Sequence, residues 1–180
     1  ANGVQNSGNS LIGSSHLISK TYFPRFIVPL AAVLVALADF GVSLLLLVPM
    51  MAFHAARPPL AILLLPPVVA LAAGLAIGVG AYLSALNVQY RDVRVLIPFL
   101  LQLWMYTTPV VYPLEVLPPR LRLLALLNPM TGIVEAFRAC LIGTPLPWLA
   151  VAWSCLVTAF LLVTGAYYFR RMERLFADVL

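Results

Sequence analysis

The chain has 180 residues, of which 63% are hydrophobic and only 9% are charged. Soluble domains contain roughly 45–50% apolar and about 25% charged residues, so this composition excludes a water-soluble fold and favours a helical membrane protein. The net charge is +5, but the basic residues stand in small groups at the ends of apolar runs, which argues against nucleic acid as a partner and favours membrane lipids.

The chain opens in a polar stretch, residues 2–15, without a starting methionine or a signal-peptide pattern, and we expect an N-terminal truncation. The first long apolar run, about residues 26–53, follows Lys20 and Arg25 and is long enough to cross a bilayer with some tilt. One acid, Asp39, lies near the middle of this run. A hydrogen-bonded carboxyl that holds helices together and a place on a substrate path are equally good interpretations of Asp39.

A short break with Pro58 and Pro59 allows only a turn before the second run, about residues 60–86. Ala70, Gly74 and Gly78 stand four apart in it and form a small face, which we interpret as packing within the chain rather than between subunits. A polar loop, residues 87–94, precedes the third run, about residues 95–112.

Residues 114–143 contain apolar pieces that are each too short to span, separated by prolines and charges. Asn128 can cap a helix that begins at Pro129, and Glu135 and Arg138 stand one helical turn apart and can pair. We therefore predict a re-entrant helical hairpin here. The last run, about residues 148–169, is followed by a basic tail, residues 170–180.

The re-entrant interpretation also decides the topology, because it places both basic ends on one side of the membrane. The positive-inside rule then counts seven cytoplasmic basic residues (Lys20, Arg25, Arg91, Arg94, Arg170, Arg171, Arg174) against four outside (Arg57, Arg120, Arg122, Arg138). We predict four transmembrane helices, an external hairpin and two cytoplasmic ends.

Catalytic and cofactor motifs are not evident in the sequence. Lys20-Thr21 is not the end of a phosphate-binding loop, because serines occupy positions 14 and 19 where that motif has glycines. A single membrane acid forms no proton relay. Cys140 and Cys155 lack metal-ligand spacing, and we expect both to be buried as small apolar residues. We predict no catalytic, cofactor-binding or metal site.

Six segments carry a family resemblance in their order along the chain: LISKTYFPR (17–25), ALADF (36–40), SALNVQYRDVR (84–94), PFLLQLWMYTTPVVYP (98–113), LLNPMTGIVEAFRACLIG (126–143) and YFRRMERLFADVL (168–180). On these segments the chain resembles the permease subunits of type-2 ABC transporters that export polysaccharides. That group handles O-antigen, capsule, teichoic acid and polyol phosphate chains.

The resemblance implies an all-α domain over residues 1–180, with four of six spans present. It implies a homodimer of the permease in the cytoplasmic (inner) membrane, paired with two copies of a separate ABC ATPase subunit that binds ATP and magnesium. The implied cargo is a lipid-linked glycan. Two rival functions are a type-2 permease for drugs or small lipids and a membrane-embedded glycosyl or phosphoryl transferase of envelope synthesis.

The resemblance also assigns candidate site residues. Residues 14–25 correspond to a coupling helix that contacts the ATPase through Leu17, Ile18, Lys20, Tyr22, Phe23, Pro24 and Arg25. An interfacial helix on lipid headgroups is the alternative. Arg91 and Asp92 either contact the ATPase or only stabilise their loop.

A pore or external gate is implied for Trp104, Tyr106, Pro109, Tyr112, Pro113, Asn128, Pro129, Glu135 and Arg138. Aromatic faces suit the C–H faces of sugars. An interfacial aromatic belt without substrate contact is the alternative for Trp104 and Tyr112. For Glu135 and Arg138 we favour a role in fixing the fold of the gate over contact with sugar.

Overall fold

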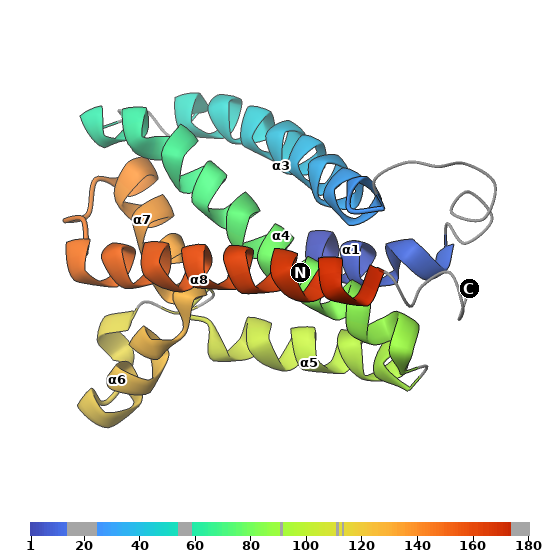
Figure 1. Ribbon diagram of the computed structural model, residues 1–180. Coiled ribbons are helices and arrows are strands. Elements are labelled where there is room, and N and C mark those ends of the chain that lie inside the picture. Colours follow the sequence, from blue (N-terminus) through green and yellow to red (C-terminus); the bar gives the residue numbers. More distant parts are fainter. Residues whose placement is uncertain (14–24, 54–58, 91, 111, 113, 174–180) are drawn as a thin grey trace. The chain divides into compact units, whose positions relative to one another are not determined.

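The computed structural model describes residues 1–13, 25–53, 59–90, 92–110, 112 and 114–173 (Figure 1). All regular structure in these residues is helical: α1 (Asn2–Gly13), α3 (Ile27–Phe53), η1 (Leu60–Leu64), α4 (Leu65–Gln89), α5 (Val93–Thr107), η2 (Leu114–Val116), α6 (Pro119–Leu127), α7 (Pro129–Ile142) and α8 (Trp148–Glu173). The predicted all-α membrane fold is confirmed. Most of the predicted coupling helix, residues 14–24, lies outside the described residues.

Three described helical segments are long and apolar enough to cross a membrane: Ile27–Met51, Leu60–Gln89 and Trp148–Glu173. Helix α5 has 15 residues and is therefore about 22 Å long, shorter than the roughly 30 Å hydrocarbon core. The predicted third run is helical only as far as Thr107; residues 108–110 and Tyr112 are not helical. A crossing by this run stays a prediction.

The segment predicted as a re-entrant hairpin contains two helices, α6 and α7. Their axes are bent by 95° at a break on Asn128, which a broken span or a re-entrant loop would show. A straight crossing by this segment is excluded. Helix α6 begins at Pro119, directly after Pro118, and α7 ends at Gly143, whose φ of 83° is a left-handed helix end that glycine adopts without strain.

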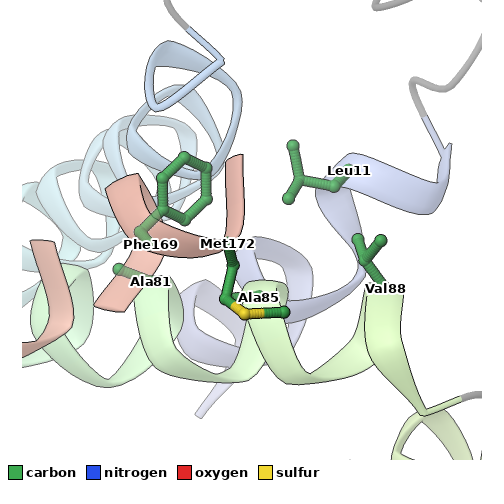
Figure 2. Close-up of a cluster of buried hydrophobic side chains, with 6 residues drawn as sticks. All are labelled: Leu11, Ala81, Ala85, Val88, Phe169 and Met172. Carbon is green, nitrogen blue, oxygen red and sulfur yellow. The ribbon is translucent and has the colours of Figure 1, made fainter. Parts of the chain in front are cut away.

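The contacts divide the chain into two compact units, and the first comprises residues 1–38, 73–104 and 159–180. Figure 2 shows part of its core, where Leu11 of α1 and Phe169 and Met172 of α8 surround Ala81, Ala85 and Val88 of α4. The alanines let neighbouring helices approach α4 closely, which is how helices associate in a membrane, where burial of apolar surface supplies little net drive.

Helices α4 and α8 come into backbone contact at two glycines. A Cβ on Gly78 would lie 2.9 Å from the carbonyl carbon of Leu161, and a Cβ on Gly165 would lie 2.7 Å from the carbonyl oxygen of Gly78. At Gly78, therefore, the small face packs within the chain, as predicted.

Helix α1 lies in the polar opening stretch, where the sequence indicated no regular element. Val4, Ser7, Gly8 and Leu11 are its buried positions, a stripe with helical spacing. A Cβ on Gly8 would lie 3.3 Å from the side chains of both Leu83 and Ile97, so α1 packs against α4 and α5.

The second unit comprises residues 39–72 and 105–158 and contains the hairpin. Helix α7 packs tightly on the start of α8, since a Cβ on Gly132 would overlap the carbonyl group of Ala150. Phe40 of α3 packs edge-on against Phe137 of α7, with 5.6 Å between ring centroids. Cys140 is buried in this unit, as expected, but Cys155 is exposed because it lies on an outward face of α8, so that expectation was wrong.

Candidate functional site

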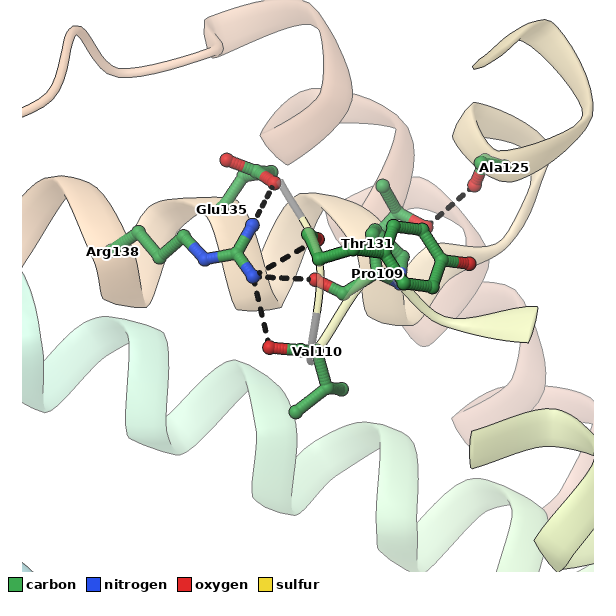
Figure 3. A network of polar contacts seen from close by, with 7 residues as sticks. Pro109, Val110, Ala125, Thr131, Glu135 and Arg138 are labelled. Carbon is green, nitrogen blue, oxygen red and sulfur yellow. Dashed lines mark hydrogen bonds and ion pairs between the residues drawn. The ribbon is translucent and has the colours of Figure 1, made fainter. Parts of the chain in front are cut away.

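Arg138 of α7 bonds the hairpin to the loop after α5 (Figure 3). Its Nη1 donates to Oε1 of Glu135 at 2.6 Å, and its Nη2 donates to the carbonyl oxygens of Pro109, Val110 and Tyr112 at 2.8, 2.9 and 3.2 Å. These carbonyls lie beyond the end of α5, where backbone groups need partners from outside the helix. Arg138 therefore holds the 109–112 loop against α7, and we call this arrangement the Arg138 clamp.

The Arg138 clamp is electrostatically balanced. The two charged side chains are only 21% and 18% exposed, so each needs its partner to offset the loss of hydration. The predicted pairing of Glu135 with Arg138 is confirmed. Its position between two backbone segments supports a role in fixing the fold, whereas contact with a sugar stays a prediction.

Asn128 fixes the bend between α6 and α7. Its Oδ1 accepts from the backbone N–H of Met130 at 3.0 Å, which is the predicted N-cap with Pro129 at the first helical position. Its Nδ2 donates to Oγ1 of Thr108 at 2.9 Å. Oγ1 of Thr131 donates to the carbonyl of Ala125 at 2.5 Å (Figure 3). The bend is thus tied to the same loop that Arg138 holds.

A second set of bonds attaches the hairpin to α8. Oγ of Ser154 donates to the carbonyl of Pro129 at 2.6 Å, and Nε1 of Trp153 donates to the carbonyl of Leu127 at 3.1 Å. Ser154, Thr108 and Gly132 were not predicted as site residues. Only Gly132 carries a sequence signal, as a glycine inside a helix, where a close approach is the usual reason for its presence.

The aromatic residues and prolines predicted for the gate do not all belong to this site. Tyr106 is exposed on α5, and its carbonyl accepts from the hydroxyl of Tyr112 at 3.3 Å. Pro109 is fully buried, so its ring offers no surface to a substrate. Trp104 belongs to the first unit and packs against the cluster of Val4, Ile97 and Leu101. Pro113 lies outside the described residues.

Few of the residues predicted to contact an ATPase are described. Nη1 of Arg25 donates to the carbonyl of Glu173 at 2.9 Å, so the start of α3 is bonded to the end of α8. Asp92 is exposed just before α5, and its carbonyl accepts from the N–H groups of Val95 and Leu96. Leu17, Ile18, Lys20, Tyr22, Phe23, Pro24 and Arg91 lie outside the described residues.

Asp39 is exposed on α3, and its carbonyl accepts from Oγ of Ser43 at 3.0 Å. The contacts assign its carboxyl no role, and both interpretations of this acid stay predictions. Among the described residues, no group of three or more His, Cys, Asp or Glu side chains could hold a metal ion.

Comparison with known proteins gives a consistent result. Residues 5–142 match the family model described as "ABC-2 type transporter". An O-antigen export system permease protein RfbA of Klebsiella pneumoniae is 24% identical over 181 residues, which cover 100% of this chain and 70% of that protein. A protein of the same name from Myxococcus xanthus is 30% identical over 133 residues, 73% of this chain and 51% of that protein.

The family and the apolar helices identify a membrane subunit of a transporter rather than an enzyme, and the family implies a partner ATPase subunit. The match covers far more than half of the 180 residues. The chain therefore belongs to the ABC-2 type transporter family.

Proposed function

We propose that the chain is the membrane-spanning permease subunit of an ATP-driven exporter that moves lipid-linked polysaccharide of the O-antigen type outward across the cytoplasmic membrane. The observation that carries this proposal is the alignment of the whole chain with proteins named O-antigen export system permease. These relatives favour the glycan over the two rivals, a permease for drugs or small lipids and an envelope transferase.

In the proposed assembly, two copies of the permease pair with two ATPase subunits, which bind ATP and magnesium. Residues 14–25 contact the ATPase. The bond from Arg25 to the carbonyl of Glu173 supports this role, because it attaches one flank of the segment to the last turn of α8. The other flank follows α1, which packs on α4. Movement of the ATPase would then act on α3, α4 and α8 at once.

The same bond supports the proposed topology. The start of α3 and the end of α8 lie together, so an even number of crossings separates them. Arg170 and Arg171 lie in the last turn of α8, near Arg25. With the positive-inside rule, the basic residues at this end support our proposal that it is cytoplasmic and that the hairpin is external.

The hairpin serves as the external gate in this proposal. Its brace, formed by the Arg138 clamp and Asn128, joins α7 to the 108–112 loop, so the two would move as one body. Opening would then be a rigid displacement of the braced hairpin rather than melting of its helices. Tyr106 and Tyr112 beside it would offer aromatic faces to passing sugar rings.

Depletion of the full-length protein tests the proposal against synthesis. We expect lipid-linked polymer to accumulate on the cytoplasmic side while none reaches the surface, and we expect the same result with a partner ATPase that cannot hydrolyse ATP. Absence of any polymer after depletion would indicate a transferase. Normal surface polymer would exclude a role in its export.

A further inference from the structure

Helix α1 has two opposite faces of different chemistry. One carries the buried positions Val4, Ser7, Gly8 and Leu11. At 100° per residue, the opposite face carries four carboxamide side chains: Asn2, Gln5, Asn6 and Asn9. Asn2 and Asn6 are exposed, and Gln5 and Asn9 are half-buried. We call Asn2, Gln5 and Asn6 the amide face; Asn9 lies at its edge, where its Oδ1 accepts from Asn87 of α4.

The contacts of α1 with α3 and α4 show where it lies along those two helices. A Cβ on Gly3 would lie 3.0 Å from Cβ of Ala36, which is nine residues after the start of α3. A Cβ on Gly80 would overlap the side chain of Ser7, and Gly80 is nine residues before the end of α4. Nine helical residues rise about 13 Å, which is close to half of the roughly 30 Å hydrocarbon core. The first half of α1, from Asn2 to Ser7, thus lies beside the membrane-spanning parts of α3 and α4 rather than beside their ends.

The second half of α1 is bonded to α4 nearer the end of that helix, at Asn87, two residues before Gln89. Nδ2 of Asn87, a residue that is 1% exposed, donates to the carbonyl of Gly8 at 3.0 Å and to Oδ1 of Asn9 at 2.9 Å. Oδ1 of Asn87 and Oγ of Ser7 are buried without a hydrogen-bond partner among the described residues. Buried polar atoms of this kind usually bond to ordered water inside the protein, here on the packed side of α1 against α4.

Carboxamides at this depth are costly against lipid tails, because each brings donors and acceptors that hydrocarbon cannot satisfy. Polar residues inside a membrane protein normally face its interior or a water-filled cavity. An uncharged amide offers both donors and acceptors, which match the hydroxyl groups of a neutral glycan without holding it by charge.

We propose that the amide face of α1 lines the cytoplasmic half of the translocation passage and forms hydrogen bonds with hydroxyl groups of the polysaccharide as it enters. This inference rests on the proposed function and adds the surface that receives the sugar. Weak, exchangeable amide contacts suit a chain that must keep moving, since a site that binds too tightly would not release.

Thiol labelling of the full-length protein with its ATPase in inside-out membrane vesicles tests the inference. The native thiols are first removed by Cys140→Ala and Cys155→Ser. Asn6→Cys is compared with Val35→Cys, which is exposed on α3 one residue before Ala36 and so lies at a similar depth. A charged methanethiosulfonate is the probe. We expect Asn6→Cys to react roughly tenfold or more faster, because a thiol facing lipid stays protonated and dry.

Occupancy by glycan supplies the second readout. With polymer stalled by an ATPase that binds but does not hydrolyse ATP, labelling of Asn6→Cys should slow several-fold, and removal of the polymer should restore it. Labelling as slow as that of Val35→Cys, or disulfide-linked dimers as the main product, would overturn the inference by showing the face to be covered. Fast labelling that polymer does not slow would overturn the contact with glycan.

Export by two substitutions at the same position separates a contact role from a folding role. Asn6→Leu should slow export several-fold at normal protein level and normal ATPase activity, whereas Asn6→Gln should retain it. Equal export by both variants would contradict the inference. If the unmodified protein moves no polysaccharide, the proposed function fails instead, and the labelling contrast between positions 6 and 35 still tests exposure to water.

Discussion

Replacement of Arg138 by Met keeps the length of the side chain but removes every bond of the Arg138 clamp. It strands the Glu135 carboxylate and three loop carbonyls. Breaking a fully buried ion pair costs about 3–5 kcal/mol, and hydrogen bonds to charged groups contribute about 1.5–3 kcal/mol. Because both side chains are about one-fifth exposed, we expect about 2–3 kcal/mol of local destabilisation.

The native thiol of Cys140 reports this local opening, because it is fully buried two residues after Arg138. In a Cys155→Ser background, a local destabilisation of about 2–3 kcal/mol by Arg138→Met predicts that Cys140 reacts roughly 30- to 140-fold faster with a thiol reagent. In Arg138→Lys we expect a Cys140 labelling rate between those of the unmodified protein and Arg138→Met. The lysine ammonium cannot bond the carboxylate and the three carbonyls together, as the planar guanidinium does.

A double substitution provides the control for the stranded charge. Glu135→Gln with Arg138→Met removes the uncompensated carboxylate, and we expect it to recover a substantial part of the loss. An unchanged Cys140 labelling rate in Arg138→Met would refute the idea that the Arg138 clamp holds the hairpin. If Cys140 is labelled as fast in the double variant as in Arg138→Met, the unpaired Glu135 carboxylate contributes little to the destabilisation.

Three further predictions concern packing, capping and coupling. Gly132→Ala should destabilise the folded state by about 1–3 kcal/mol through its clash with α8, while Gly41→Ala, with nothing within 4 Å, should be neutral or slightly stabilising; thermal unfolding in nanodiscs compares them. Asn128→Ala should cost about 1 kcal/mol from the lost cap, measured in the same way, whereas Asn128→Asp should keep the cap, because a carboxylate oxygen also accepts from the N–H of Met130. Arg25→Glu should leave ATP hydrolysis uncoupled from export, whereas Arg171→Glu should not; similar export by both variants would count against the role of Arg25.

Local features of the sequence predicted the fold class and much of the hairpin. Apolar runs gave the long helices, and the order Asn128-Pro129 gave the cap and first turn of α7, because both signals act within a few residues. The pairing of Glu135 with Arg138 follows from one turn of helix for the same reason.

The bonds that assemble the site were not predictable, because they join distant segments. Arg138 reaches carbonyls 26 to 29 residues away, and Arg25 reaches Glu173 across 148 residues. Every residue has a backbone carbonyl, so the sequence does not mark which carbonyls will accept these bonds. Helix α1 was missed because its buried stripe uses Ser7 and Gly8, which pack well between helices but give no apolar pattern.

Export is tested directly with the full-length permease and its ATPase subunit reconstituted in proteoliposomes with lipid-linked polysaccharide. We expect ATP to move polymer across the bilayer, where an added glycan-binding protein or glycosidase reaches it on the far side. We also expect Arg25→Glu to abolish this movement while ATP is still hydrolysed. Movement that does not depend on ATP, or ATP hydrolysis by the unmodified complex without movement of polymer, would contradict the proposed export function.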